Sequence, residues 1–263
     1  MKVGIVQFEP KFGAAKHNLD RIEAEIQPPV DLVVLPELCT SGYQFVNHHE
    51  IEELAEEIPS GPSIKRLTQI AKDKDCVIVA GLPERSGDVF YNSAVVLNPK
   101  EVMAKYRKLH LFYEEKDFFA PGDIPLQVVD IGPAKIGVLI CFDWIFPEAT
   151  RTLALQGADI ICLPANLLTP YCQNAMVTRS IENQVYTVVA NRTGFEARGG
   201  KKPLYFTGGS QISDCKGNVL YSASKEKHEF HVEKIHPKLT RDKWFTDRNN
   251  LFDDRRTEFY VLK

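Results

Sequence analysis

The stretch KIGVLICFDWIFPE, residues 135–148, contains an apolar strand-like run, then a cysteine, and then an acid, aromatic residues and a proline. Its first seven residues repeat the pattern of KVGIVQF at residues 2–8. Three further segments of the first half have counterparts in the same order: DLVVLPE (31–37) with DIICLPA (159–165), VIVAG (77–81) with TVVAN (187–191), and SAVVLNPK (93–100) with SQISDCKG (210–217). Four pairs in one order predict a duplicated structure rather than the general likeness of Val- and Ile-rich strands.

Helix-like segments separate these strands in both halves. They span 15–27 and 62–74 in the first half, and 146–157 and 172–184 in the second. Continuous apolar runs such as VIVAG are typical of strands covered on both faces. Helices that alternate with such strands predict a mostly parallel arrangement. We therefore expect an α/β fold in which residues 1–263 form a single domain of two similar sheets.

The composition is that of an ordinary globular protein, with 44% hydrophobic residues and a formal net charge of -3. No basic stripe is present, so nucleic acid is a poor candidate partner. The start, MKVGIVQFEP, lacks the features of a signal peptide, and no apolar run is long enough to cross a bilayer. We expect a cytoplasmic protein with no membrane partner.

Six cysteines are scattered along the chain without a CxxC pair: Cys39, Cys76, Cys141, Cys162, Cys172 and Cys215. In a reducing compartment we expect free thiols, most of them packed in the core. The histidine pairs His48–His49 and His228–His231 lack the clustered companions that a zinc site needs. The sequence therefore predicts no metal.

Three reactive groups stand at or near the ends of strand-like runs. Cys141 ends KIGVLIC, and Glu37 ends DLVVLPE, where the second half has only Ala165. Lys108 lies in the strand-like run KYRKLHLF. Ligands of parallel sheets gather at the carboxyl ends of strands. Each group also has an ordinary interpretation, as a packed thiol, a solvated strand end or a surface charge.

The blocks that contain these residues, LPELCTSGY, KYRKLHLF and ICFDWIFPE, resemble the three signature blocks of the nitrilase superfamily of carbon–nitrogen hydrolases. Their order and separations fit as well. The resemblance implies a four-layer α-β-β-α sandwich with two pseudo-symmetric halves. It also implies a Glu-Lys-Cys triad, which carries over onto Glu37, Lys108 and Cys141.

A second glutamate of the family's site follows the lysine by a few residues. Within HLFYEEKDFFAPGD this role best fits Glu115, with the adjacent Glu114 as the alternative. Glu115 would hold Lys108 charged and correctly aimed. The resemblance implies no cofactor.

The implied chemistry is covalent catalysis by a thiol. A free thiol has a pKa of about 8.5 and is mostly protonated at neutral pH, so Glu37 would take the proton as Cys141 attacks an electrophilic carbon. Lys108 and the backbone N–H of Phe142 would stabilise the negative charge that develops on the substrate. A helix that begins near Pro147 fits this arrangement, and its dipole, if aimed at the sulfur, would favour the thiolate.

Further residues come from loops that should rim the pocket: Tyr43, Trp144, Asn166 and Tyr171. Packing explains the aromatic residues equally well. Arg192 could bind a substrate carboxylate or form a structural salt bridge. We expect Asp143 to organise its loop rather than to take part in the chemistry.

The leading hypothesis is a thiol hydrolase that cleaves a non-peptide C–N bond of a small linear amide through a thioester. The alternatives for the substrate are an aliphatic nitrile and an N-carbamoyl compound. Two other classes remain open: a peroxide-sensing protein with a low-pKa Cys141, and a binding scaffold without activity. The resemblance further implies a homodimer or dimer-based oligomer, with the C-terminal tail (247–263) packed on the partner subunit.

Overall fold

Two β-sheets lie face to face in the computed structural model, which describes residues 1–260, and helices cover their outer faces. The first sheet has the strand order β15 (Glu229–Lys234), β1 (Lys2–Gln7), β2 (Leu32–Val34), β4 (Val77–Ser86), β5 (Val89–Leu97) and β6 (Val102–Arg107), with β3 (Glu56–Glu57) beside β4. The second has the order β14 (Val219–Ser222), β13 (Gln211–Ser213), β10 (Tyr186–Ala190), β9 (Ile160–Pro164), β8 (Lys135–Val138) and β7 (Val128–Asp130).

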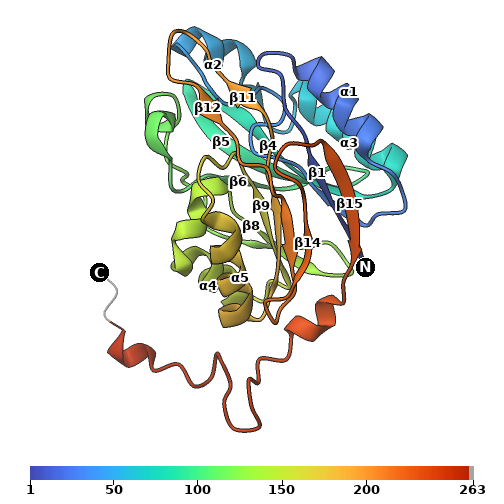
Figure 1. Cartoon of the computed structure of the whole chain (residues 1–263), viewed down its shortest axis with the longest axis vertical. Helices are drawn as coiled ribbons and strands as arrows, with labels where there is room; N and C mark the ends of the chain where they lie inside the picture. The colour runs from blue at the N-terminus through green and yellow to red at the C-terminus, as the bar shows by residue number, and fades with distance from the viewer. Residues whose placement is uncertain (261–263) are drawn as a thin grey trace.

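Helices complete the four layers of an α-β-β-α sandwich (Figure 1). The first sheet is covered by α1 (Ala15–Glu25) and α3 (Pro62–Lys74), and the second by α4 (Pro147–Leu155) and α5 (Cys172–Asn183). These four helices lie where the sequence predicts them. A shorter helix, α2 (His48–Leu54), and a small hairpin, β11 (Phe195–Glu196) with β12 (Leu204–Tyr205), lie at one end of the molecule.

The predicted duplication is confirmed by the strand orders. In each sheet three parallel strands stand together, β1-β2-β4 in the first and β8-β9-β10 in the second. An antiparallel strand pairs with the outer side of β1 and of β8, and two more follow β4 and β10. The expectation of mostly parallel sheets is wrong, because tight connections such as Gly87–Asp88 between β4 and β5 join antiparallel neighbours.

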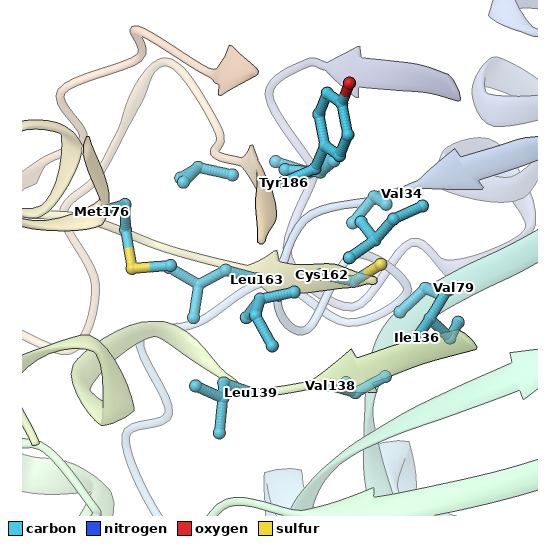
Figure 2. Packing of buried hydrophobic residues seen from close by; sticks show 14 of the residues in the cluster. Val34, Val79, Ile136, Val138, Leu139, Cys162, Leu163, Met176 and Tyr186 are labelled. Carbon is cyan, nitrogen blue, oxygen red and sulfur yellow. The ribbon is translucent and has the colours of Figure 1, made fainter. Parts of the chain in front are cut away.

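The alternation of side chains along each strand builds two cores. Val3, Ile5 and Val34 of the first sheet face the second sheet, whereas Val33 faces the helices α1 and α3. Figure 2 shows the same alternation on β9, where Cys162 lies toward the first sheet and Leu163 points away from it. Burying one such Val or Leu side chain contributes about 1.5–3 kcal/mol.

The chain leaves the sandwich after β15 and runs past the ends of α4 and α5 (Figure 1). Lys243 Nζ donates to the carbonyls of Asn183 and Gln184 at 2.8 and 3.0 Å, which ties this segment to the end of α5. Of the tail 247–263, residues 261–263 lie outside the described residues. Across residues 1–260, no helix has both the length and the apolar character that a bilayer crossing requires.

Candidate active site

The side chains of Glu37 and Lys108 meet near the carboxyl ends of two strands in the first sheet. Glu37 follows β2, and Lys108 comes directly after β6. Both side chains are completely buried, and Lys108 Nζ lies 2.6 Å from Glu37 Oε1. The structure therefore brings together two groups that are 71 residues apart in the chain.

One oxygen of Glu37 is left without a partner. Oε1 accepts hydrogen bonds from Lys108 Nζ at 2.6 Å and from Asn92 Nδ2 at 2.7 Å. Oε2 is buried and receives no hydrogen bond from any of the residues 1–260. A buried polar atom without a partner costs free energy, so this oxygen is available to accept a hydrogen bond from a bound group.

The backbone at Glu37 is fixed by a close approach of β4. A Cβ atom at Gly81 would lie 2.6 Å from Glu37 Cα and 2.8 Å from the nitrogen of Leu38. Only glycine allows these two segments to come so close. Leu38 itself has a φ of 48°, an uncommon conformation for a residue with a side chain. The surrounding structure thus fixes the conformation of the turn after β2.

Glu115 lies on the other side of Lys108. Its Oε1 accepts from Lys108 Nζ at 2.7 Å and from the Tyr43 hydroxyl at 2.8 Å, and its Oε2 accepts from the Phe112 N–H at 3.0 Å. Glu114 points elsewhere and pairs with Lys201 at 2.8 Å. Glu115, rather than Glu114, is therefore the glutamate that lies beside the lysine.

The carboxylates of Glu37 and Glu115 keep Lys108 positively charged. Burial alone would lower the pKa of Lys108, but Glu115 and Glu37 outweigh it and hold this pKa above its usual range. Burial, together with the charge of Glu37, raises the pKa of Glu115 to about 7, although Lys108 opposes the shift. Lys108 is accordingly a fixed positive charge in a buried site.

Contrary to our expectation, Cys141 does not stand at the end of a strand. Strand β8 ends at Val138, and Cys141 opens a 3₁₀ helix (Cys141–Ile145) with a φ of 43°. Asp143 holds this turn: its carboxylate accepts from Ile140 N at 2.9 Å, from the Tyr106 hydroxyl at 2.7 Å and from His110 N at 3.1 Å. The prediction that Asp143 organises the loop is confirmed.

The surroundings of Cys141 favour the protonated thiol. Burial raises its pKa well above the ordinary value, and the charges of Glu37 and Glu115 add to the effect. Lys108 and the backbone N–H of Asn166 act in the opposite direction without overcoming it. The expected thiolate-favouring influence of a helix dipole does not prevail. Attack by this sulfur therefore needs a base that removes its proton.

The residues after Cys141 lie as the sequence suggests. Helix α4 begins at Pro147. The backbone N–H of Phe142 belongs to the first turn of the 3₁₀ helix, where such groups have no acceptor within the helix. It can therefore donate to an oxygen atom bound near the sulfur.

A small pocket opens over the thiol. It is lined by Cys141, Phe112, Phe142, Trp144, Asn166, Leu167, Leu168 and Thr169. Asn166 is buried, and neither polar atom of its side chain has a partner among residues 1–260. Tyr43 lines an adjacent small pocket, which shares Phe112 and Leu168 with the first. The expectation for Tyr171 is wrong, because this side chain is 64% exposed and lines neither pocket.

Arg192 forms a buried ion pair with Glu196 and lies 3.9 Å from the ring centre of Phe206. Of the two interpretations of Arg192, the structure supports the structural salt bridge. The six cysteines are all buried free thiols, as expected. Within the described part of the chain, no three His, Cys, Asp or Glu side chains gather in a way that could hold a metal ion.

Sequence reasoning missed the polar residues that hold the site in place. Asn92 binds Glu37, while Tyr106 and His110 bind Asp143. The available signal was Asn92 itself, a polar residue inside the apolar strand FYNSAVV. A buried polar residue is more informative than a buried apolar one.

Comparison with known proteins gives matches along nearly the whole chain. The family profile described as carbon-nitrogen hydrolase matches residues 2–242. A nitrilase of Pyrococcus abyssi is 47% identical over 264 residues, which cover 99% of each chain. An (R)-stereoselective amidase of a Pseudomonas species is 34% identical, covering 89% of this chain and 84% of its own length.

Solved structures agree with these sequence matches. The crystal structure of a carbon-nitrogen hydrolase from Helicobacter pylori G27 superimposes with a TM-score of 0.86 at 25% identity. The match covers 99% of this chain and 96% of that one. The similarity therefore extends over both sheets and all four layers.

Proposed function

This chain belongs to the carbon-nitrogen hydrolase family, and from that premise we propose that it hydrolyses a small linear amide through a thioester on Cys141. The observation that carries the proposal is the buried network around Lys108. The lysine lies 2.6 Å from Glu37 and 2.7 Å from Glu115, and all three charges act on the Cys141 thiol.

The first half of the reaction forms the thioester. The sulfur of Cys141 attacks the amide carbon while Oε2 of Glu37 takes the thiol proton. The carbonyl oxygen becomes negatively charged and is stabilised by the Lys108 ammonium and the Phe142 N–H. The C–N bond then breaks, and Glu37 gives its proton to the nitrogen, which leaves as ammonia or an amine.

The second half releases the acid. Glu37, ionised again, takes a proton from a water molecule as the water oxygen attacks the thioester carbon. The same two donors hold the second oxyanion. The C–S bond breaks, the proton returns to the sulfur, and the carboxylic acid leaves. A protonated resting thiol supports this sequence, because the sulfur and the base then exchange one proton throughout.

The pocket supports a small uncharged substrate. Most side chains around Cys141 are apolar, and Asn166 offers one donor and one acceptor that no described residue uses. No Lys or Arg of residues 1–260 lines this pocket, and Arg192 is already paired with Glu196. Apart from Lys108, which we assign to the oxyanion, a substrate carboxylate would therefore find no cation there, which disfavours N-carbamoyl amino acids.

A nitrile is the second candidate substrate, supported by the 47% identity to the Pyrococcus abyssi nitrilase. Attack on a nitrile carbon gives a thioimidate. Water then adds and ammonia leaves, which produces the same thioester. The two substrates thus share every group named above and differ in the first adduct.

The peroxide-sensing alternative depends on a low-pKa thiol. Because burial raises the pKa of Cys141, the structure gives no support to that function. The presence of the complete network also argues against a scaffold without activity. We retain hydrolysis as the proposal.

The test is hydrolysis of matched aliphatic amides and nitriles of the same chain length, followed by ammonia release and by mass spectrometry of the Cys141 peptide. We expect ammonia, an acyl group on Cys141, and no turnover by Cys141→Ala. Turnover of the nitrile and not of the amide would select the second candidate. Failure of both, or full activity of Cys141→Ala, would contradict the proposal.

We also propose that two copies of the chain associate through α4 and α5. Leu155 of α4 and Ile181 of α5 are about 40% exposed. Trp244 and Phe245, in the segment that precedes the tail, are also exposed and lie near Ile181. Apolar residues gathered on one side of the sandwich fit a partner surface. Residues 247–260 of the tail would then pack on the partner subunit.

A further inference from the structure

Arg192, in the connection between β10 and β11, forms a buried ion pair with Glu196 of β11. Arg192 Nη1 donates to Glu196 Oε1, and its other nitrogens donate to the carbonyls of Thr193 at 3.2 Å and Pro10 at 3.3 Å. Both charges are removed from water, which costs several kcal/mol per ion and leaves little net stability from the pair. The ion pair therefore matters for the positions of the groups around it rather than for stability.

Glu196 holds the loop that carries Tyr43. Its Oε1 accepts the Tyr43 N–H at 3.1 Å, and its Oε2 accepts the Gln44 N–H at 2.6 Å. Glu37 lies in the same loop after β2, so both ends of the seven-residue segment 37–43 matter for the site. Arg192 fixes the carboxylate, and the carboxylate fixes the backbone of Tyr43.

Tyr43 in turn contacts the charged network. Its hydroxyl donates to Glu115 Oε1 at 2.8 Å, and that same oxygen accepts from Lys108 Nζ at 2.7 Å. The ring of Tyr43 also packs edge-on against Phe206, with 5.8 Å between ring centres. Arg192 lies over the same Phe206 ring, at 3.9 Å. Two sets of contacts thus connect the ion pair with Tyr43.

We propose that Arg192 and Glu196 are positioning residues of the active site, which hold Tyr43 against Glu115 and through Glu115 fix the ammonium of Lys108. The pair lines neither of the two pockets beside Cys141, so it acts through Tyr43 and not on the substrate. This inference rests on the proposed function in so far as Lys108 holds the oxyanion.

A double-mutant cycle between Glu196→Asp and Tyr43→Phe tests the connection. Aspartate keeps a charge for Arg192 but is too short to reach both backbone N–H groups. We expect each single change to lower kcat by about tenfold, because small misplacements of catalytic groups have large effects. In the Tyr43→Phe background, Glu196→Asp should lower kcat by less than about twofold more.

Asp159→Asn is the matched control. Asp159 is also a buried carboxylate, which accepts the backbone N–H of Lys135 at 2.9 Å and pairs with Arg241. It precedes β9, whereas the pocket residue Asn166 follows β9, so Asp159 lies at the end of this strand away from the site. This change should lower the melting temperature and leave kcat unchanged. Independent, multiplicative effects of Glu196→Asp and Tyr43→Phe on kcat would overturn the proposal.

A second readout needs no substrate. The rate at which iodoacetamide alkylates Cys141, followed by peptide mass spectrometry across pH, responds to the charges of Glu37, Lys108 and Glu115. The two single variants and the double variant should shift this pH profile in the same direction and by the same amount. Additive shifts would contradict the inference even in an inactive protein, whereas coupled shifts without hydrolysis would contradict only the proposed function. If Glu196→Asp does not fold, Arg192→Lys takes its place in both cycles.

Discussion

Asn92 is the residue whose contribution to the site is easiest to isolate. Its Nδ2 donates to the same Glu37 oxygen that binds Lys108, which leaves Oε2 as the oxygen free to accept a proton. Replacement by leucine, of similar size, removes this donor and lets the carboxylate rotate. We expect Asn92→Leu to lower kcat by about tenfold or more with little change in KM, measured by ammonia release.

Asn98→Leu provides the control for this prediction. Asn98 follows the same strand, and its side chain accepts the N–H groups of Lys100 and Glu101 in an exposed turn. This variant should lose some stability and keep its kcat. Equal losses of kcat in the two variants would show that Asn92 acts through the fold and not through Glu37.

The raised pKa of Glu115 predicts how stability depends on pH. In the unfolded chain this carboxyl titrates near 4.5, and burial beside Glu37 raises its pKa to about 7 in the fold. Between these values the native state binds more protons, so this group's contribution to stability falls as pH rises. The free energy of unfolding of the wild type, measured relative to Glu115→Gln in urea, should fall from about pH 4.5 to 7 and then level off. A difference that rises over this interval would contradict the shift.

At the scale of elements, the helices were the most predictable part. Helix α3 lies at Pro62–Lys74 as predicted, because proline stands in its first turn and an apolar stripe follows. The strand at 31–37 is shorter than predicted, since only Leu32–Val34 pairs and the chain then turns. Strand direction was not predictable from alternation of helices and strands, because an antiparallel strand follows the third parallel strand in each sheet. The connection is the short turn Gly87–Asp88 in the first sheet and the long segment 191–210 in the second.

The site residues also differ in how far the sequence predicts them. Glu37, Lys108, Glu115 and Cys141 were predicted because they stand in recognisable blocks. Asn92 and Tyr106 come from strands β5 and β6. The polar Asn92 inside an apolar strand signals a buried partner, but the sequence does not say which group either side chain will reach. Their role depends on how two strands lie next to a distant loop. Such contacts are set by tertiary packing, which local sequence pattern does not encode.

Gly81 of β4 offers a test at this scale. A methyl group there would meet the backbone of Glu37 at 2.6 Å, and backbone cannot give way as a side chain can. We expect Gly81→Ala to cost about 1–3 kcal/mol of stability and to move Glu37 out of place, with a loss of kcat beyond the loss of folded protein. Urea unfolding and kcat per folded molecule measure the two effects.

Gly4→Ala in β1 of the same sheet is the comparison. Its added methyl would lie 3.1 Å from side-chain atoms of Phe230 and Val30, which can shift. It should cost stability without changing kcat per folded molecule. A Gly81→Ala enzyme with full kcat would mean that the close approach does not position Glu37.

For the whole molecule, duplication explains how one site arises from two similar halves. The matching places Glu37 opposite Ala165 and Cys141 opposite Phe8, so each half supplies a group that the other lacks. Face-to-face packing of the sheets brings both turns to one region, where Lys108 joins them. Neither half alone contains both the proposed base and the thiol, and the proposed catalytic set therefore depends on the interface between the sheets.

The proposed association of two chains can be tested on the same scale. Leu155 and Ile181 are 42% and 43% exposed on α4 and α5, so a charge at either position can remain in water in a single chain. In a dimer built on these helices the same charges would be buried without a partner, at a cost of several kcal/mol. We expect light scattering to give a dimer or a multiple of it for the wild type, and a smaller particle for Leu155→Glu/Ile181→Glu.

Val89→Glu supplies the matched control, since Val89 is 41% exposed but lies at the start of β5 in the first sheet. This variant should keep the wild-type mass. Circular dichroism should show that all three proteins are folded, so that a change in mass reports association alone. A wild-type protein that stays monomeric at micromolar concentrations, or a double variant of unchanged mass, would exclude α4 and α5 as the contact surface.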